Sequence, residues 1–392
     1  MTDPRQAYRD AGPNATQRTG RTPVGGRVLV GLSGKTERAD SFLVAALLRS
    51  QGYEVIGLHL RVTPPADNDW AGFKASCTAQ PPVERVQEIC AKLDIPLHIE
   101  DVHAQMIHEV SDFAVHEALR NRVARLCVPC NDRIRIPTLL KKAADLRCER
   151  IATGHHVQVV HDLTGGPVRL MRSANRGLDQ SYDLFRLSQA TLSKLLTPLG
   201  SLSPNLLSRL AQELELPPAV GHPVREEKVC FTDSPGYSQY IESRVAPSLR
   251  APGVIRSMEG AVFGDHQGLF RYRLGQSLGV ASRAGSDRVV VGFAPSVGAL
   301  IAGEPSELVA IEILVGGIHW VRPLDGLRPH RCQVVIRHGG APRACDVIQF
   351  ENGTAHLHFT EKLNDALPGQ SAVFYDGDEV LGGGLIDSLR KV

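Results

Sequence analysis

The sequence predicts an α/β protein whose first half forms a doubly wound parallel sheet and whose last third is rich in β-structure. Two observations support this fold class. Strand-like and helix-like segments alternate between residues 27 and 155, which is the pattern of repeated βαβ units. From about Ala251 onward, short β-branched runs are separated by Gly, Pro, Asp and Asn, which is typical of small barrels or sandwiches.

The individual elements follow from the local apolar pattern. Arg27–Gly31 is a β-branched run that ends in small residues, as buried parallel strands do. A polar loop, residues 33–41, then leads into a helix at residues 42–49. By the same reasoning we expect strands at 53–60, 96–99, 150–152, 289–293, 333–337, 355–359 and 372–375, and helices at 83–93, 106–124, 137–146 and, in short pieces, 187–214.

The expected sheet also predicts where a ligand binds. In doubly wound sheets, ligands bind at the carboxyl ends of the strands, where the strand order reverses. The loops that follow Gly31, Leu60 and Ala152 lie at such ends. These three loops are therefore the first places in which to look for functional side chains.

Composition excludes several classes of protein. The chain has 392 residues, a net charge of +2 and 42% hydrophobic residues, an ordinary globular balance. No apolar run reaches the roughly 18 residues that a membrane helix needs. Residues 1–26 are polar and resemble a disordered tail, not a signal peptide. We therefore expect a cytoplasmic protein, not a membrane protein, with its eight cysteines mostly reduced.

The first candidate site is the loop Gly31-Leu32-Ser33-Gly34-Lys35-Thr36, which lies between the first strand and the first helix. Backbone N–H groups in such a loop can hold phosphates, helped by the helix N-terminus. A Walker A loop is excluded, because Leu29 stands where that motif requires Gly. The alternative is a tight strand-to-helix turn with Lys35 in solvent.

A second candidate site is the pair Cys127 and Cys130, with Cys230 about 100 residues further along. Two cysteines at this spacing can be redox-active or can bind a metal. Three cysteines can bind three irons of an iron–sulfur cluster, or can supply a nucleophile and a sulfur carrier. The alternative is that all three are buried, small hydrophobic side chains.

Two polar segments complete the local candidates. Thr153-Gly154-His155-His156 follows a strand, where His155 either binds a ligand or is a hydrogen-bonded core side chain. Asp179-Gln180-Ser181-Tyr182 either contacts a nucleotide or caps the helix that follows.

Taken in order, these segments resemble a known family. The strongest match is the run from Pro368 to Asp378 followed by Leu381-Gly382-Gly383-Gly384. Other matches are 52–58, 95–97, Cys130-Asn131 with Ile134, 151–155, 179–182, 187–188, 198–200 and Gly275-Gln276. Over residues 27 to 388, the chain is similar to the MnmA/TRMU family of tRNA-specific 2-thiouridylases.

The resemblance implies a three-part architecture. An adenine-nucleotide alpha-hydrolase (PP-loop) domain is expected at residues 27–220, a central linker domain at 221–290 and a C-terminal β-barrel at 291–392. It also implies an enzyme that uses ATP and Mg²⁺ to replace the C2 oxygen of the wobble uridine, position 34 of tRNA, with sulfur through an adenylated intermediate. The implied partners are tRNA and a sulfur donor or relay protein, and some members of the family use a [4Fe–4S] cluster.

The resemblance also implies roles for individual residues. Cys130 and Cys230 match the two catalytic cysteines, and Cys127 lies in the segment that touches the target base. Cys127, Cys130 and Cys230 are together the three possible ligands of a cluster. The nucleotide-binding positions implied are Gly31, Leu32, Ser33, Gly34, Asp40, Ser41, Leu60 and Gly154. The implied tRNA-binding positions are Cys127, His155, Asp179, Gln180, Arg337, His338 and Gln370.

The chain departs from the family pattern at the pyrophosphate loop. Members carry Ser-Gly-Gly-x-Asp-Ser, whereas here Lys35 follows Ser33-Gly34 and Asp40-Ser41 come three residues late. The run Arg225-Glu226-Glu227-Lys228-Val229 before Cys230 also lacks the expected Asp-Ser-x-Gly. Two activities therefore stay open: an ATP-dependent tRNA sulfurtransferase, and a tRNA-binding pseudoenzyme or sulfur-relay partner that has lost the use of ATP.

Overall fold

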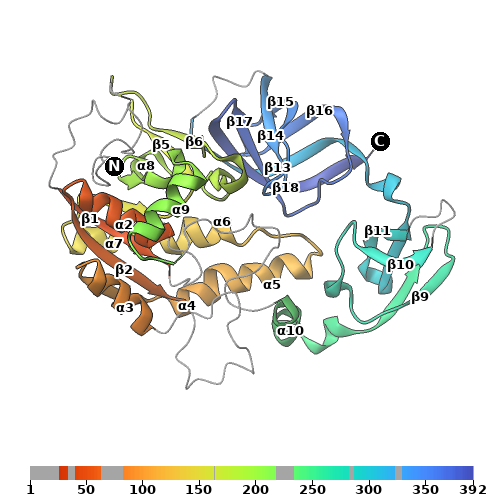
Figure 1. Cartoon of the computed structure of the whole chain (residues 1–392). Helices are drawn as coiled ribbons and strands as arrows, with labels where there is room; N and C mark the ends of the chain where they lie inside the picture. The colour runs from red at the N-terminus through yellow and green to blue at the C-terminus, as the bar shows by residue number, and fades with distance from the viewer. Residues whose placement is uncertain are drawn as a thin grey trace. The chain divides into compact units, whose positions relative to one another are not determined.

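The computed structural model (Figure 1) describes residues 26–33, 40–62, 83–162, 164–217, 234–281, 287–322 and 329–391. The tail expected at 1–26 therefore lies outside the described residues, except for Gly26. The chain divides into two compact units. The first contains the chain up to Glu109, Cys127–Ser234 and Asp378–Val380, and the second contains Val110–Leu126, Pro235–Gly377 and Leu381–Val392.

A five-stranded parallel sheet forms the centre of the first unit. Its strand order is β3 (Leu97–Asp101), β2 (Glu54–Arg61), β1 (Arg27–Leu32), β4 (Arg150–Thr153) and β7 (Leu195–Leu196). The chain starts in the middle at β1, runs outward to β3 and then returns to the other side of β1 with β4. The strand order therefore reverses between β1 and β4, which makes that junction the topological switch point.

Helices cover both faces of this sheet, as the sequence predicts for a doubly wound fold. Alternate residues of a strand face opposite sides, so Val28 and Val30 of β1 face one layer and Gly31 faces the other. The layer on the Val28 side consists of α2 (Asp40–Ser50), α3 (Val83–Lys92) and α9 (Pro204–Glu213). On the other face, the Leu139 side chain of α7 (Ile136–Asp145) lies against Gly31, where a Cβ atom would be 3.0 Å from Leu139 Cδ1.

The helix expected at 106–124 is shorter and less regular than predicted. It consists of α4 (His103–Met106), the π-helical turn η1 (Ile107–Ser111) and α5 (Asp112–Leu119). Asn121 has a left-handed backbone, with a φ of 55°, and its amide donates to the carbonyls of Leu269 at 2.6 Å and Tyr272 at 3.1 Å. The helix ends early because these distant contacts favour the turn.

Short elements connect the sheet to the candidate site. They are α6 (Cys127–Pro129), the π-helical turn η2 (Cys130–Arg135), the hairpin β5 (Val157–Val160) and β6 (Arg169–Arg172), η3 (Arg176–Leu178), η4 (Ser181–Asp183), α8 (Gln189–Leu192) and η5 (Pro198–Ser201). The expected helical stretch 187–214 thus forms separate pieces. Pro198 and Pro204 stand at the beginning of η5 and α9, where a missing N–H costs nothing.

The second unit contains two β-structures. A five-stranded sheet has the order β10 (Ser277–Ala281), β11 (Asp287–Ala294), β12 (Ala299–Gly303), β8 (Gly253–Arg256) and β9 (Val262–His266). This unit also carries α10 (Ser234–Arg244) and the single turns η6 (Pro247–Arg250), η7 (Leu269–Arg271), η8 (Pro295–Val297) and η9 (Pro305–Leu308). The expected domain boundary at residues 290–291 lies within β11.

The C-terminal strands close into a barrel. They are β13 (Ala310–Trp320), β14 (His330–Val335), β15 (Arg343–Gln349), β16 (Ala355–Leu363), β17 (Ser371–Asp376) and β18 (Glu379–Lys391). β13 pairs with both β16 and β18, so the sheet has no open edge at that point. The barrel interior holds side chains such as Val334, Leu357 and Phe374, all fully buried.

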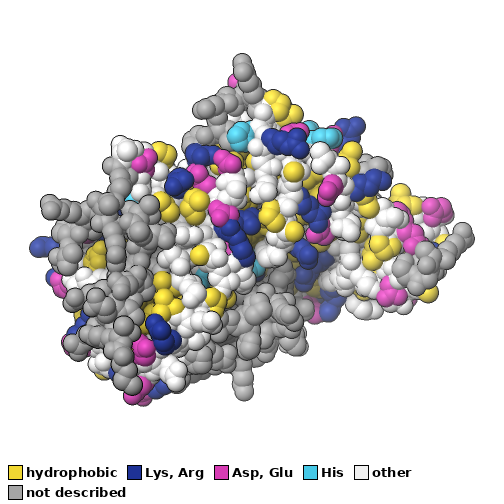
Figure 2. Space-filling model, turned by 45° about the horizontal axis from the view of Figure 1, so that its top comes forward, with side chains coloured by type: hydrophobic (Ala, Val, Ile, Leu, Met, Phe, Trp, Pro, Cys, Tyr) yellow, Lys and Arg dark blue, Asp and Glu magenta, His cyan; other side chains and the backbone are white. Residues whose placement is uncertain are grey.

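Charges on the surface are mixed. On the face in Figure 2, Lys and Arg side chains are interspersed with Asp and Glu. This agrees with the small net charge of +2 and with many arginine–carboxylate pairs, such as Arg322–Asp376 at 3.0 Å and Arg27–Glu54 at 2.8 Å. Within the described ranges, none of the helices combines the length and the hydrophobicity needed to cross a lipid bilayer.

Candidate active site

The switch point brings together two of the three loops expected to bind a ligand. In the sheet register Gly31 lies opposite Thr153, and Leu32 lies opposite His59. Ser33, at the end of β1, and Gly154, at the end of β4, therefore emerge at the same edge. Leu60 lies on the neighbouring strand β2, one residue before its end. Most of the expected nucleotide-binding positions share this edge, whereas Gly34 lies outside the described residues.

Hydrogen bonds fix the two ends of the strand-to-helix loop. Ser33 N donates to Ser41 Oγ at 3.0 Å, and the two hydroxyl oxygens are 3.3 Å apart. Ser41 is buried at the beginning of α2, next to Asp40. The end of β1 is thus tied directly to the first turn of α2, which is how a strand–loop–helix unit directs helix N–H groups toward a phosphate.

Gly154 makes the closest approach between β4 and α2. A Cβ atom at this position would be 2.9 Å from the backbone nitrogen of Ser41 and 3.2 Å from the carbonyl carbon of Asp40. No side chain fits there, so only glycine allows β4 to lie this close to the helix N-terminus. The residues at both ends of the loop therefore fit the phosphates of a nucleotide, and the carboxylate of Asp40 is the kind of oxygen ligand that Mg²⁺ prefers.

His155 and His156 follow at once and face different surroundings. His156 is fully buried, and its Nε2 is 3.6 Å from Asp40 Oδ2. His155 Nδ1 is 2.9 Å from Thr153 Oγ1. Removal from water, followed by the charge of Arg135, lowers the pKa of His155 to about 3, although Asp183 acts in the opposite direction. The imidazole of His155 is therefore neutral at physiological pH.

This lowered pKa predicts a pH dependence of stability. The unfolded chain binds the proton near pH 6.5, whereas the folded chain binds it only near pH 3. Stability is therefore fully present above pH 6.5 and is lost as pH falls toward 3. Between pH 7 and pH 5, the parent loses unfolding free energy because the unfolded chain takes up this proton. We expect the loss in His155→Gln to be smaller by up to about 2 kcal/mol, measured by urea unfolding. His116→Gln, on the exposed face of α5, should lose as much as the parent, and an equal loss in His155→Gln would contradict the assignment.

The two expected cysteines lie at a break in helical geometry. Cys127 begins α6, and Cys130 begins the π-helical turn η2; such turns are frequent at functional sites. Cys130 is 8% exposed, and Cys127 is half-buried. Asn131 Nδ2 donates to the carbonyl of Asp183 at 3.3 Å, and Arg186 Nε donates to Asp132 at 3.0 Å. The cysteine segment is therefore tied to residues 183–186.

The described residues do not complete a metal site. Cys230 lies outside them, and among the described residues no group of three His, Cys, Asp or Glu side chains could hold a metal ion. Cys127 and Cys130 supply two thiols for a [4Fe–4S] cluster, which ordinarily has four cysteine ligands. The described cysteines alone therefore do not complete the ligand set of a cluster.

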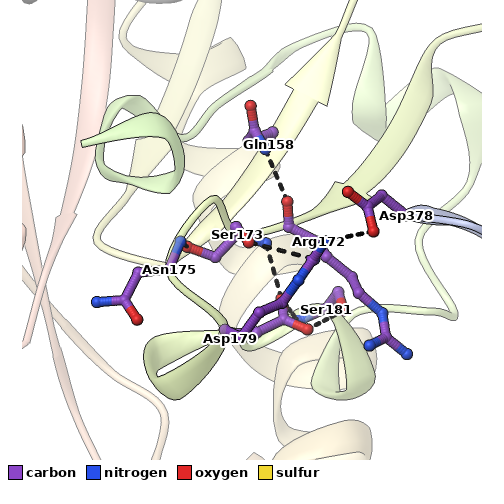
Figure 3. Close-up of polar contacts among 8 residues, drawn as sticks. Gln158, Arg172, Ser173, Asn175, Asp179, Ser181 and Asp378 are labelled. Atoms are coloured by element: carbon purple, nitrogen blue, oxygen red, sulfur yellow. Dashed lines mark hydrogen bonds and ion pairs between the residues drawn. The ribbon is translucent and has the colours of Figure 1, made fainter. Parts of the chain in front are cut away.

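Asp179 and Gln180 lie beside the end of β4, where Gln180 contacts His156. Gln180 Oε1 accepts from His156 N at 2.9 Å, and Gln180 N donates to His156 O at 3.1 Å. The Asp179 carboxylate accepts from Ser173 N at 2.9 Å, from Ser181 N at 3.2 Å and from Ser181 Oγ at 2.9 Å (Figure 3). The structure thus brings both residues to the same edge as His155.

The remaining expected tRNA-binding residues belong to the second unit. Arg337 Nε lies 3.4 Å from Asp365, which also pairs with Arg343 at 2.9 Å. His338 follows Arg337 just after β14. Gln370 Oε1 accepts from Leu367 N at 2.8 Å, so its amide shapes the turn before β17.

Sequence reasoning missed His59, Arg135 and Asp183. His59 Nδ1 is 3.1 Å from the Leu32 carbonyl, and burial lowers the pKa of His59, with Arg61 and Arg135 acting in the same direction. Arg135 also acts on His155, so one guanidinium influences both rings. The only signal in the sequence was a histidine near the carboxyl end of a buried strand, beside Leu60. Nothing local distinguishes Arg135 or Asp183 from surface charges.

Comparisons with known proteins identify the family of this chain. A family model described as a tRNA methyl transferase HUP domain matches residues 26–234, and one described as an aminomethyltransferase β-barrel domain matches residues 311–386. The tRNA-specific 2-thiouridylase MnmA of Symbiobacterium thermophilum is 32% identical over 383 residues, with 95% of each chain covered. That of Carboxydothermus hydrogenoformans is 30% identical over 361 residues, covering 92% of this chain and 97% of its own.

A solved structure was also compared. The U34-tRNA thiolase NcsA from Methanococcus maripaludis, with its [4Fe-4S] cluster, aligns with 14% identity and a TM-score of 0.34, over 61% of this chain and 72% of that chain. The classification rests on the two sequence relatives and on the first family model, which spans more than half of the chain. The chain belongs to the MnmA/TRMU family of tRNA-specific 2-thiouridylases.

Proposed function

We propose that this protein catalyses ATP-dependent transfer of sulfur to C2 of the wobble uridine, position 34, of tRNA. One observation carries the proposal. The switch point places the Ser33–Ser41 loop ends, Gly154 and His155 at one sheet edge, and the Cys130 segment is tied to residues 183–186 beside it. This reaction needs a nucleotide and a thiol, and the residues proposed to bind the nucleotide and to supply the thiol belong to the first unit.

The chemistry divides between these two parts. The uridine C2 oxygen displaces pyrophosphate from ATP, which converts a poor leaving group into AMP. The terminal sulfur of a persulfide on Cys230 then attacks C2 and displaces AMP. The thiolate of Cys130 attacks the Cys230 sulfur, which leaves the terminal sulfur on C2 and forms a Cys130–Cys230 disulfide. An external thiol reduces that disulfide, and a sulfur donor or relay protein renews the persulfide.

The roles proposed for the other residues follow from their positions. The phosphate site is formed by Gly31, Leu32, Ser33, Gly34, Ser41 and Gly154. Asp40 binds Mg²⁺. Leu60 lies on β2 for contact with the adenine. His155 and Gln180 face the base of the tRNA, while Arg337, His338 and Gln370 in the second unit contribute further tRNA contacts. Cytoplasmic tRNA is the proposed substrate.

The altered loop favours a second candidate function. Lys35 stands where family members have the second Gly of Ser-Gly-Gly-x-Asp-Ser, and that Gly lets the backbone approach phosphate closely. A chain that cannot hold ATP would still bind tRNA, because phosphate contacts dominate affinity for nucleic acid. It would also still have cysteines on which to carry sulfur. This candidate is a tRNA-binding pseudoenzyme or a sulfur-relay partner.

ATP binding separates the two candidates. For the sulfurtransferase we expect ATP with Mg²⁺ to raise the melting temperature, and we expect 2-thiouridine and AMP to form when tRNA and a sulfide donor are added. Mass spectrometry of digested tRNA measures the thiolated base. A protein that ATP does not stabilise and that forms no AMP, yet still binds tRNA, would be the relay partner or pseudoenzyme.

A variant in the loop tests the site itself. Ser41→Ala removes the hydroxyl that accepts from Ser33 N, and we expect the Kd for ATP to rise about tenfold, which is the worth of one such hydrogen bond. Ser50→Ala is the matched control, because Ser50 Oγ donates to Leu47 O at the far end of the same helix. Equal Kd values for the two variants, by isothermal titration calorimetry, would place the nucleotide elsewhere.

A further inference from the structure

The loop between β6 and η4, residues 173–181, is closed by a single carboxylate. Asp179 Oδ1 accepts from Ser173 N at the beginning of the loop and from Ser181 N at its end, at 2.9 and 3.2 Å. Asp179 Oδ2 accepts from Ser181 Oγ at 2.9 Å. Hydrogen bonds to a charged acceptor are worth about twice those between neutral groups. Figure 3 shows that the Asp179 carboxylate faces its own loop.

The beginning of this loop is anchored to the domain core. Ser173 Oγ donates to the Gly200 carbonyl at 3.2 Å, and Ala174 N donates to the same oxygen at 2.8 Å. Gly200 belongs to η5 and lies directly against Val157 of β5. Ser173 is fully buried. The beginning of the loop therefore has a fixed position, and Asp179 transmits that position to the end of the loop.

A second anchor comes from Asp378, which belongs to the same unit and immediately precedes β18. Arg172 N donates to the Asp378 carbonyl at 2.8 Å, and the Arg176 guanidinium pairs with the Asp378 carboxylate. Glu379 then pairs with Met171 of β6, and Gln158 Nε2 donates to the Arg172 carbonyl at 2.8 Å. The strand that leads into the loop is therefore held on both sides.

The end of the loop supports the candidate active site. Gln180 pairs with the backbone of His156 in both directions, and His156 follows His155 at the end of β4. The turn η4 packs against α6, which carries Cys127, and the Asp183 carbonyl accepts from Asn131 at 3.3 Å. Displacement of residues 180–183 would therefore move the support of both His155 and the Cys127–Cys130 segment.

We infer that Asp179 is a positioning residue for the sulfur-transfer site, in which its carboxylate holds the 173–181 loop. This inference rests on the proposed function only where thiolation of tRNA is measured. The carboxylate already accepts three hydrogen bonds from its own loop, and a contact with RNA phosphates would place two negative charges together. Asparagine can retain the two backbone hydrogen bonds at Oδ1, whereas alanine retains none.

The test compares Asp179→Ala with Asp179→Asn. For alanine we expect kcat for thiolation to fall about tenfold, with the tRNA KM and Kd changed by less than about threefold, because the loop geometry is lost and phosphate contacts are kept. For asparagine we expect near-parental kcat. Asp162→Ala is the matched control, since Asp162 likewise accepts from the backbone and hydroxyl of Thr164, at 2.8 and 2.7 Å, in an exposed turn.

A second readout needs no activity. Trypsin releases residues 126–133 after Arg125 and Arg133, and fragmentation of that peptide distinguishes alkylation of Cys127 from that of Cys130. In tRNA-free protein we expect maleimide to alkylate Cys130 about fivefold faster in Asp179→Ala than in the parent, because local opening exposes a buried thiol. Asp179→Asn and Asp162→Ala should match the parent.

The two readouts separate this inference from the proposed function. If the parent protein does not thiolate tRNA, the proposed function fails, and the alkylation rates still decide the role of Asp179. If Asp179→Ala does not fold, Ser181→Ala removes one of the three hydrogen bonds and should raise the Cys130 rate by a smaller factor. A tRNA Kd that rises tenfold in both Asp179 variants, with Cys130 alkylated at the parental rate, would overturn the inference.

Discussion

Cys130→Ala is expected to abolish tRNA thiolation while leaving tRNA binding unchanged. In the proposed reaction the Cys130 thiolate breaks the sulfur–sulfur bond that releases sulfur to the base, and alanine has no group that can do this. Loss of a nucleophile of this kind lowers the rate by about a thousandfold or more. Affinity for tRNA comes mainly from phosphate contacts, so the Kd should stay within about twofold. Single-turnover thiolation and filter binding measure the two quantities.

Cys90→Ala is the matched control for this variant. Cys90 is also a buried thiol of the first unit, located in α3 within the hydrophobic core, and burial raises the pKa of its thiol to about 11. It lies in no candidate site, so its variant should thiolate at nearly the parental rate. Sustained thiolation by Cys130→Ala would remove Cys130 from the reaction, whereas equal losses in both variants would indicate a general effect of removing a buried thiol.

Gly200→Ala is expected to lower the unfolding free energy of the protein by about 3 kcal/mol or more, an overpacking cost at the upper end of the usual range. A Cβ atom at this position would lie 1.8 Å from the Val157 carbonyl oxygen and 2.2 Å from its carbon. Both are backbone atoms, so no rotamer change relieves the overlap. The Gly200 carbonyl also accepts from Ser173 Oγ and Ala174 N, and a shift of η5 weakens both bonds.

Differential scanning calorimetry measures this change, with an expected fall in melting temperature of about 10 °C for a unit of this size. Gly177→Ala is the matched control in the same loop region. The only neighbour of a Cβ atom there is Asn175 Oδ1 at 3.4 Å, so the expected change is within about 0.5 kcal/mol. A Gly200→Ala protein as stable as the parent would show that η5 does not pack against β5 this closely.

The fold class and the order of the elements could be predicted from local patterns. Runs such as Arg27–Gly31 are recognisable because a buried strand must be apolar along its length, and a Gly-containing turn after a strand marks a ligand-binding edge. The strand-to-helix loop and the Thr153–His155 segment were predicted as candidate sites in this way. The lengths of several helices were not, because Asn121 ends its helix through carbonyls about 150 residues away along the chain.

The sequence by itself therefore determined the strands β1 to β4 and the helices α2, α3 and α7 of the parallel-sheet unit, and which loops carry thiols, imidazoles and glycines. Only the tertiary structure decided that the ends of β1 and β4 meet, that burial, with the charge of Arg135, lowers the pKa of His155, and that Asp179 turns toward its own loop. The reason is physical: periodicity reports whether a side chain is buried, whereas its partners depend on strand order and on contacts between segments that are distant in the chain.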